Sequence, residues 1–136
     1  MICISIRQPW AWLIVHGYKP VENRTWPTNI RGDVLIHAAK GMTMAELEAA
    51  YEFIASRRIQ IPETPVPSQL QRGGIIGQAR LVDCVRRSES PWFVGPFGHV
   101  FADPKPLPFQ PLKGMLGYFH VEPGAFVPPG DQLALL

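Results

Sequence analysis

The side chains able to do chemistry are concentrated in two short segments near the amino terminus. Together these segments contain the following residues: Ser5, Arg7, Gln8, Pro9, Trp10, Lys19, Glu22, Asn23, Arg24 and Trp26. If the second segment is a strand, period-two alternation places Glu22, Arg24 and Trp26 on one face and Asn23 on the other. An acid, a base and an aromatic ring would then line up. The alternative is a solvent-exposed ion pair of Glu22 with Lys19 or Arg24, worth about 0–1 kcal/mol.

The same part of the chain is locally basic. The net charge is only +2, so bulk charge does not identify a nucleic-acid-binding protein. The first forty residues, however, hold more basic than acidic side chains: Arg7, Lys19, Arg24, Arg31 and Lys40 against Glu22 and Asp33. These basic residues are numerous enough to form a binding site, or else they belong to an ordinary solvated face.

Several common site types have no sequence signature. The pairs Gly73-Gly74 and Gly95-Pro96 lack the spacing and the lysine of a phosphate-binding loop. The four histidines are far apart and neither HExxH nor CxxC occurs, so we expect structural histidines, no metal and no cofactor. Cys3 and Cys84 lie in apolar runs, no signal peptide is evident, and no apolar run reaches about 20 residues. These features predict a cytoplasmic protein without membrane contact.

Two strands and a short helix are expected to position the candidate residues. Isoleucines alternate over residues 2–6 as in a strand, and apolar spacing from Pro9 to His16 predicts a helix that Gly17 ends. Because a residue before proline is kept out of the α region, Lys19 should lie on a stiff extended loop. A second strand is predicted over residues 21–26, a turn over 27–32 and a third strand over 34–37.

The rest of the chain predicts a mixed fold. Thr43 and Glu46 form a capping box for a helix that ends near Arg57, and the proline-rich stretch 61–67 reads as a surface loop. Three further β-rich runs are expected at residues 74–85, 97–102 and 115–121, with Gly77 and Gly117 suited to bulges or bends. About six strands and two main helices in this order favour an α+β pseudo-barrel. At 136 residues, 46% hydrophobic and 18% charged, the chain should form one domain.

Three blocks of sequence carry a resemblance to a known family. Residues 5–11 (SIRQPWA), residues 17–24 (GYKPVENR), and Arg31-Gly32 followed by LIHA at 35–38 resemble the amino-terminal signature of ASCH domains, whose hallmark is G-x-K-x-x-E-x-R. The late stretches at 97–101, 113–114 and 117–119 are similar to that family's last strands. The likeness covers about residues 2–122. It predicts an ASCH, PUA-like domain at 1–122 and a tail at 123–136 whose packing stays open.

The resemblance implies a cleft beside the barrel that binds RNA, single-stranded nucleic acid or a modified nucleoside. Its floor would be Lys19, Glu22 and Arg24, with Arg7 and Gln8 on one wall; Ser5 and Arg31 complete the expected binding set. The cations could neutralise phosphates. A base could stack on a tryptophan at position 10, 26 or 92, which is worth about 1–3 kcal/mol. For the tryptophans at 10 and 12, a place in the core is an equal alternative.

Some members of the resembled family are metal-independent amidohydrolases of N4-acetylcytidine, and others are associated with RNA cleavage. Lys19 matches the amidohydrolase lysine, but Glu22 stands where those relatives have a hydroxyl residue, and Asp83 is the nearest candidate for the downstream acid. Burial would favour a neutral, nucleophilic Lys19, whereas Glu22 favours the ammonium. The ammonium form suits phosphate binding better than deprotonation. For RNA cleavage, Lys19, Glu22 and Arg24 could act as acid, base and oxyanion stabiliser.

Three functional hypotheses follow from the sequence. The leading one is a binding domain for RNA or a modified nucleotide. The second is a hydrolase that uses Lys19 and Glu22. The third is a protein-interaction module with the 62–67 loop and a Trp92-Phe93 patch as its surface, since exposed apolar patches often mark partner surfaces; no particular protein partner is indicated.

Overall fold

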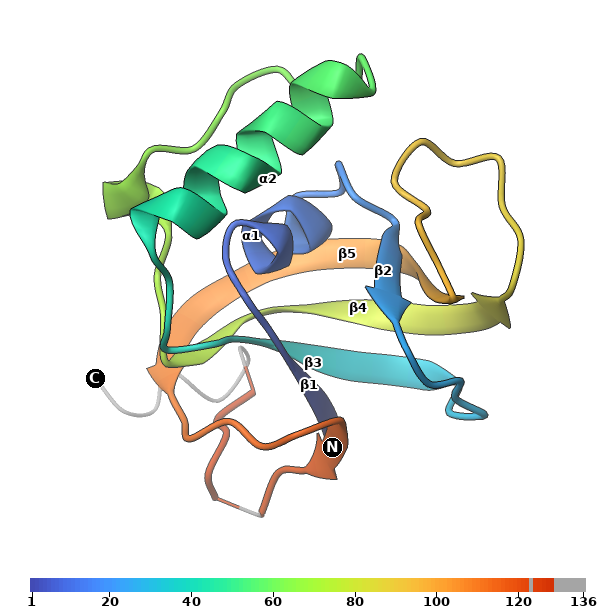
Figure 1. The fold of residues 1–136 in the computed structure, drawn as a ribbon. Coiled ribbons are helices and arrows are strands. Elements are labelled where there is room, and N and C mark those ends of the chain that lie inside the picture. Colours follow the sequence, from blue (N-terminus) through green and yellow to red (C-terminus); the bar gives the residue numbers. More distant parts are fainter. Residues whose placement is uncertain (123, 129–136) are drawn as a thin grey trace.

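The computed structural model describes residues 1–122 and 124–128, and these form one curled sheet with two main helices on its concave side (Figure 1). The elements in chain order are β1 (Ile2–Ile6), α1 (Trp10–Val15), β2 (Val21–Arg24), β3 (Gly32–Ala38), α2 (Met44–Ser56), the 3-10 turn η1 (Pro67–Gln69), β4 (Gly74–Val85), β5 (Phe97–Pro111) and β6 (Tyr118–His120). The six strands lie in the order β2-β5-β4-β3-β1-β6. The predicted α+β pseudo-barrel is confirmed.

The sheet is mixed, and its curl brings its ends toward each other. β1 pairs in parallel with β3, and the other neighbouring strands are antiparallel. The register shifts beside Gly77, where a Cβ atom would lie 2.5 Å from Val15 and 2.7 Å from the Lys105 carbonyl. Glycine therefore lets α1 approach β4 closely at the predicted bulge.

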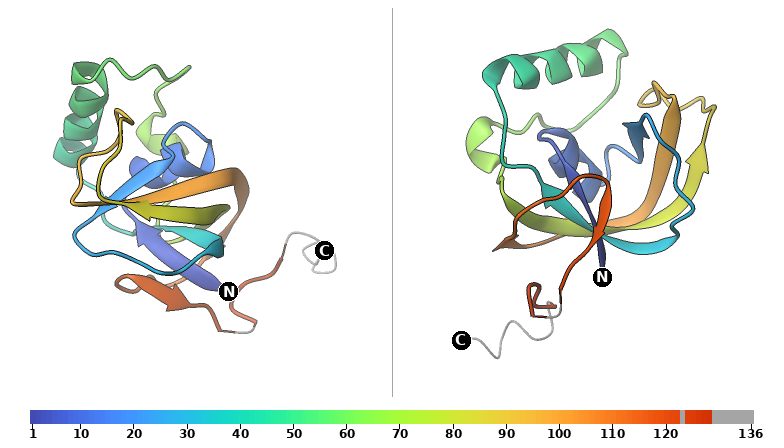
Figure 2. Two further views of the ribbon diagram at one scale, coloured as in Figure 1. Left: turned by 90° about the vertical axis from the view of Figure 1, so that its right-hand side faces the viewer. Right: turned by 60° about the horizontal axis from the view of Figure 1, so that its bottom comes forward.

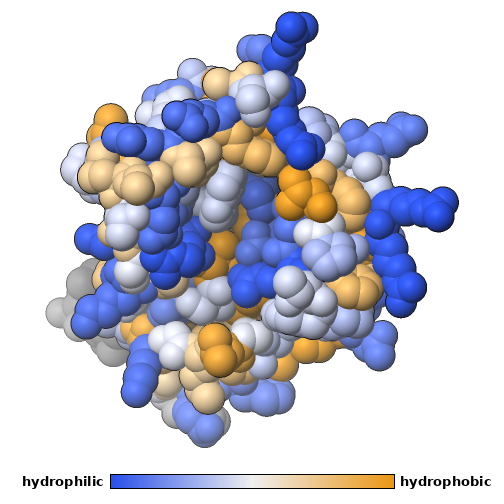
Figure 3. Space-filling model, in the orientation of Figure 1, coloured by the Kyte–Doolittle hydropathy of each residue, from blue (hydrophilic) through white to orange (hydrophobic). Residues whose placement is uncertain are grey.

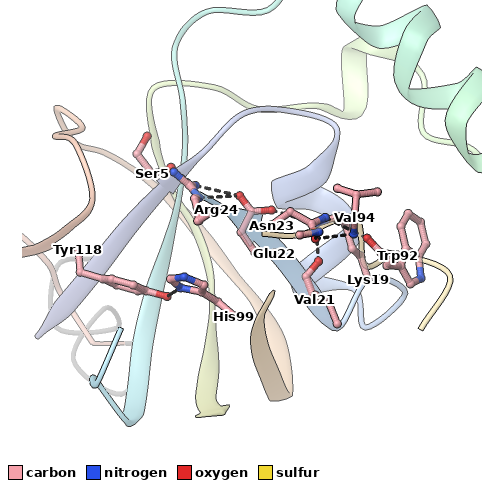
Figure 4. Close-up of polar contacts among 11 residues, drawn as sticks. Ser5, Lys19, Val21, Glu22, Asn23, Arg24, Trp92, Val94, His99 and Tyr118 are labelled. Carbon is pink, nitrogen blue, oxygen red and sulfur yellow. Dashed lines mark hydrogen bonds and ion pairs between the residues drawn. The ribbon is translucent and has the colours of Figure 1, made fainter. Parts of the chain in front are cut away.

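Side chains complete the barrel where hydrogen bonds do not. β2 and β6 are the two edges of the sheet. The ring of Trp26, just after β2, contacts Tyr118 of β6 edge-to-face at 5.6 Å and His99 of β5 at 4.9 Å. His99 and Tyr118 stack at 5.7 Å and are joined by a 2.8 Å hydrogen bond, which Figure 4 shows. An aromatic cluster thus bridges the gap between the edge strands.

The two helices stack in layers over the hollow of the sheet, as the second view of Figure 2 shows. α1 lies directly on the sheet, where Ala11, Ile14 and Val15 join the main core. On its other side, Leu13 packs against Leu47 and other apolar residues of α2 in a second core cluster. The Thr43 hydroxyl accepts a hydrogen bond from the Glu46 amide at 3.1 Å, which confirms the N-cap half of the predicted capping box. The Glu46 carboxylate accepts from Arg7 and from the Thr43 hydroxyl and does not reach back to the Thr43 amide.

Strand boundaries differ from the sequence prediction where proline and turns are involved. β2 ends at Arg24, two residues early, and β6 covers only three residues. β5 instead continues past Ala102 to Pro111. β2 pairs only with the first residues of β5, Phe97–Val100, and leaves that edge of β5 unpaired further along. The later prolines of β5 can therefore face this unpaired edge, while β4 pairs with the other edge.

Part of the predicted tail contacts the sheet. Gln110 and Val127 exchange two hydrogen bonds of 2.8 Å, and Phe126 packs against a third core cluster that contains Cys3 and Leu35. The other tail positions, 123 and 129–136, lie outside the described residues, so a domain boundary at 122 stays a prediction. None of the described helices is long and apolar enough to cross a membrane.

Candidate functional site

A tight turn after α1 places Lys19. Gly17 has φ +83, a left-handed conformation that glycine adopts without steric cost. The Leu13 carbonyl then accepts hydrogen bonds from the amides of Tyr18 and Lys19 at 2.9 and 3.1 Å. The chain therefore turns back tightly after α1, and Lys19-Pro20 leads directly into β2.

Lys19, Glu22 and Arg24 form one buried ionic cluster (Figure 4). The Lys19 ammonium donates to Glu22 Oε1 at 2.9 Å and to the Val21 carbonyl at 2.6 Å. Arg24 donates to Glu22 Oε2 from Nε at 3.1 Å and from Nη2 at 2.9 Å. The Lys19 and Glu22 side chains are only 4% and 10% exposed, so the alternative of a solvent-exposed ion pair is wrong.

The cluster has a net positive charge and a fully engaged carboxylate. Burial by itself would raise the pKa of Glu22, but the adjacent Lys19 ammonium and Arg24 guanidinium hold that pKa below its ordinary value. Both carboxylate oxygens already accept hydrogen bonds. An ammonium has three donors, and Lys19 uses two of them, while its Nζ lies 5.4 Å from the centre of the Trp10 ring.

A cavity of about 540 Å³ lies between α2 and β2, and we call it the α2 cavity. Lys19 and Glu22 lie at its floor, and its aromatic walls are Trp10, Phe53 and Trp92. The Trp10 ring stands at 89° to Phe53 and 87° to Trp92, at centroid distances of 5.8 and 6.4 Å. The space-filling view shows this face of the molecule hollowed below α2 (Figure 3). Its volume falls in the range that encloses small molecules.

Two amide side chains beside the α2 cavity have structural roles. Asn23, on the opposite face of β2 from Glu22, donates to the Trp92 carbonyl at 2.9 Å and accepts from the amides of Val94 and Gly95. It therefore holds the loop that carries Trp92. Gln8, predicted as a wall residue, does line the cavity, but its amide is engaged by the Gln71 carbonyl and the Trp12 amide.

Comparisons with known proteins place this chain in a family. The ASCH domain family matches residues 4–94, a span that includes the whole ionic cluster. The chain belongs to the ASCH domain family. It is 34% identical over 91 residues to activating signal cointegrator 1 of Homo sapiens and 36% identical over 92 residues to that of Mus musculus. Each match covers 64% of this chain but 15% of the relative.

Solved ASCH structures share the fold. The crystal structure of ASCH from Zymomonas mobilis superimposes with a TM-score of 0.54, covering 99% of this chain and 94% of that one at 15% identity. A tyrosine-to-phenylalanine mutant of the same Zymomonas mobilis protein gives a TM-score of 0.56, covering 99% of this chain and 96% of that one at 15% identity. At this identity the likeness concerns the fold alone.

A second, larger cavity lies beside the α2 cavity of this ASCH domain. It has a volume of about 930 Å³, and we call it the basic cavity because its charged lining residues are all cationic: Arg7, Lys40, Arg72 and Lys113. Predicted residue Ser5 lines it and shares a 2.9 Å hydrogen bond with His37 Nδ1. His37 Nε2 lies 2.6 Å from the Leu112 carbonyl, so the imidazole is held at both nitrogens.

Other predicted residues of the ASCH domain line neither cavity. Arg24, expected on the floor, is one of them, and its Nη2 also donates to the Ser5 carbonyl at 3.0 Å. Trp26 belongs to the aromatic cluster that bridges the sheet edges. Arg31 donates to the Thr28 and Ile30 carbonyls and lies 3.9 Å from Asp83, at an exposed position on β4. Asp83 is thus paired with Arg31 and does not line the α2 cavity with Lys19.

One site feature was absent from the sequence interpretation, and one residue that it named lies in a different environment. Phe53 and Glu46, both on α2, line the α2 cavity, and helical spacing indicated only that α2 has an apolar face. Trp92, expected on an exposed patch, is 4% exposed and packs into the second core cluster. Among the described residues, no group of three or more His, Cys, Asp or Glu side chains could hold a metal ion.

Proposed function

We propose that this ASCH domain binds a nucleobase of RNA or single-stranded nucleic acid, or a modified nucleoside, in the α2 cavity. The observation that carries the proposal is the pairing of aromatic walls with a floor formed by the buried Lys19–Glu22 ion pair, in a space of about 540 Å³. Trp10 and Phe53 are only half-buried, so their rings offer apolar surface to a planar ligand.

Lys19 supports recognition of a hydrogen-bond acceptor on that ligand. Two of its three donors are fixed by Val21 and Glu22, which hold the ammonium in one place. The remaining donor is suited to a base carbonyl or a ring nitrogen, and the net positive charge of the Lys19, Glu22 and Arg24 cluster favours an acceptor with partial negative charge. A pre-positioned donor costs little conformational entropy on binding.

The same contacts favour binding over hydrolysis. A general base needs an oxygen or nitrogen free to take a proton, but each Glu22 oxygen is engaged by a cation. A nucleophilic lysine needs its neutral form, yet Lys19 donates to a carboxylate and to a carbonyl. We therefore place amidohydrolase and ribonuclease activity second.

A binding titration with product analysis tests the proposal. Wild type, Lys19→Met and Trp10→Leu are titrated with cytidine, N4-acetylcytidine and a short single-stranded RNA, and the tubes are analysed by chromatography. Losing a stacked base costs about 1–3 kcal/mol, so Trp10→Leu should weaken binding roughly 5- to 150-fold. Arg87→Ala, an exposed change outside both cavities, should have no effect.

The outcomes separate the hypotheses. Binding that both cavity variants weaken, without product, supports recognition. Acetate or cleaved RNA that forms with wild type and not with Lys19→Met would make the domain a hydrolase. Equal affinities of the two folded variants and wild type would contradict the proposed site.

A further inference from the structure

The basic cavity is charged in a way that the α2 cavity is not. Among the described residues that line it, four are cationic and none is acidic. Lys40, Arg72 and Lys113 are exposed, and none of them forms an ion pair with a described acidic residue. Three unneutralised cations around one hollow attract an anion, and a hollow of about 930 Å³ is larger than one phosphate needs.

Arg7 connects the two cavities. It lines both of them, and its Nε and Nη2 atoms donate to the Glu46 carboxylate at 2.6 Å at the rim of the α2 cavity. The guanidinium lies against Gly41, where a Cβ atom would come within 3.2 Å of Nη1 and 3.3 Å of Nη2, and Nη1 makes no hydrogen bond with a described residue. Gly41 lines the basic cavity. One guanidinium therefore borders both cavities, and its Nη1 is not used by a described residue.

We infer that the ligand is a polynucleotide strand whose base occupies the α2 cavity and whose neighbouring phosphates occupy the basic cavity, held by Arg7, Lys40, Arg72 and Lys113. This inference rests on the proposed function, and it narrows that function from a free nucleoside to a strand. A nucleoside would leave the basic cavity without a role, whereas a strand places anions at regular spacing beyond the base.

The walls of the basic cavity suit a strand in a second respect. Met115 and Leu116, on the loop before β6, line the cavity and are 62% and 99% exposed. A sugar or the face of a second base can bury apolar surface against these side chains, beside the cations. A small inorganic anion would make no use of them.

The test compares charged and uncharged probes. The probes are a mixed-sequence single-stranded RNA hexamer that contains all four bases, and the four free nucleosides. The variants are the triple change Lys40→Ala, Arg72→Ala and Lys113→Ala, and the matched control Arg87→Ala, which removes an exposed cation outside both cavities. All three altered side chains are exposed, and thermal unfolding of each variant checks that the fold is retained.

The expected result is a large effect confined to the hexamer. Each phosphate contact on a single strand contributes about −0.7 to the slope of log K against log salt, so the slope for the triple variant should be less negative by about 2. Relative to 1 M salt, that change corresponds to roughly a hundredfold weaker hexamer binding at 0.1 M salt. Nucleoside affinity in the triple variant, and every affinity of the Arg87→Ala control, should equal wild type.

Failure of the inference differs from failure of the proposed function. If Trp10→Leu weakens hexamer binding while the triple variant leaves hexamer affinity and salt slope unchanged, the basic cavity does not hold phosphates and the ligand is a nucleoside or a base alone. If the hexamer, the four nucleosides and N4-acetylcytidine all fail to bind, the proposed function fails as well. Competition by hexaglutamate as strong as by the hexamer would assign the basic cavity to acidic peptides instead.

Discussion

Replacing Glu22 with glutamine tests how much the negative charge of Glu22 stabilises the buried cluster. In the wild type one carboxylate balances two cations, with Oε1 2.9 Å from Lys19 Nζ and Oε2 2.9 Å from Arg24 Nη2. Glutamine keeps the shape but removes the charge. The Lys19 ammonium, with a side chain 4% exposed, would then be left with the Val21 carbonyl as its strong acceptor.

The magnitude follows from the geometry. At an effective dielectric constant of about 20, opposite charges 2.9 Å apart attract by about 6 kcal/mol, most of which offsets the cost of burial. Removing one partner of a buried pair typically costs about 3–5 kcal/mol because an uncompensated charge remains. We therefore expect Glu22→Gln to lower the free energy of unfolding by about 3–4 kcal/mol, which is roughly 10 °C in Tm for a domain of this size.

A double-mutant cycle isolates the cause. Lys19→Met alone should cost only about 1–2 kcal/mol, because Glu22 keeps its two hydrogen bonds with Arg24. In the double variant the buried ammonium is gone, and the glutamine carbonyl can still accept from Arg24. The double variant should therefore be more stable than Glu22→Gln, with a coupling of about 2–3 kcal/mol measured by urea unfolding at pH 7.

The pH dependence of stability checks whether the charge of Glu22 is the cause. Because the folded-state pKa of Glu22 is lowered, its stabilisation is present above the ordinary glutamate pKa and is lost as the pH falls through the folded value. The gap between wild type and Glu22→Gln should close in acid. Effects that add within about 0.5 kcal/mol, or a gap that persists in acid, would refute the reasoning.

Three further changes test other parts of the structure. Gly17→Ala forces a side chain into φ +83 and should cost about 1 kcal/mol or more in urea unfolding; an unchanged midpoint would show that the turn from Leu13 to Lys19 relaxes freely. Asn23→Ala removes the anchor of the 92–95 loop and should raise amide hydrogen exchange there, whereas exchange equal to wild type would contradict that role. Burial lowers the pKa of His37 and His99, so the unfolded chain binds protons more readily than the folded one. Stability should therefore decline as the pH falls below about 6.5, by at most about 1.4 kcal/mol per pH unit for each histidine. A free energy of unfolding that stays constant from pH 7 to 5 would contradict this.

Local structure could be predicted from the sequence where short-range physics decides it. Alternating isoleucines specify β1, and Thr43 caps α2, which begins at Met44 as expected. The same holds for the ionic cluster, because Lys19, Glu22 and Arg24 lie within six positions on a turn and a strand whose geometry is local. The local pattern did not show whether the ion pairs of Glu22 with Lys19 and Arg24 are buried, because exposed and buried ion pairs have the same sequence spacing.

Tertiary structure alone decided which distant segments complete the site. α2 brings Phe53 over the α2 cavity and sets Glu46 against Arg7, 39 positions away, because α2 packs against α1. Asp83, by contrast, follows β4 away from Lys19 to Arg31. Residue types and spacing therefore determined the ionic cluster, whereas the cavities arise from the packing of layers, which depends on contacts that no short stretch of sequence contains.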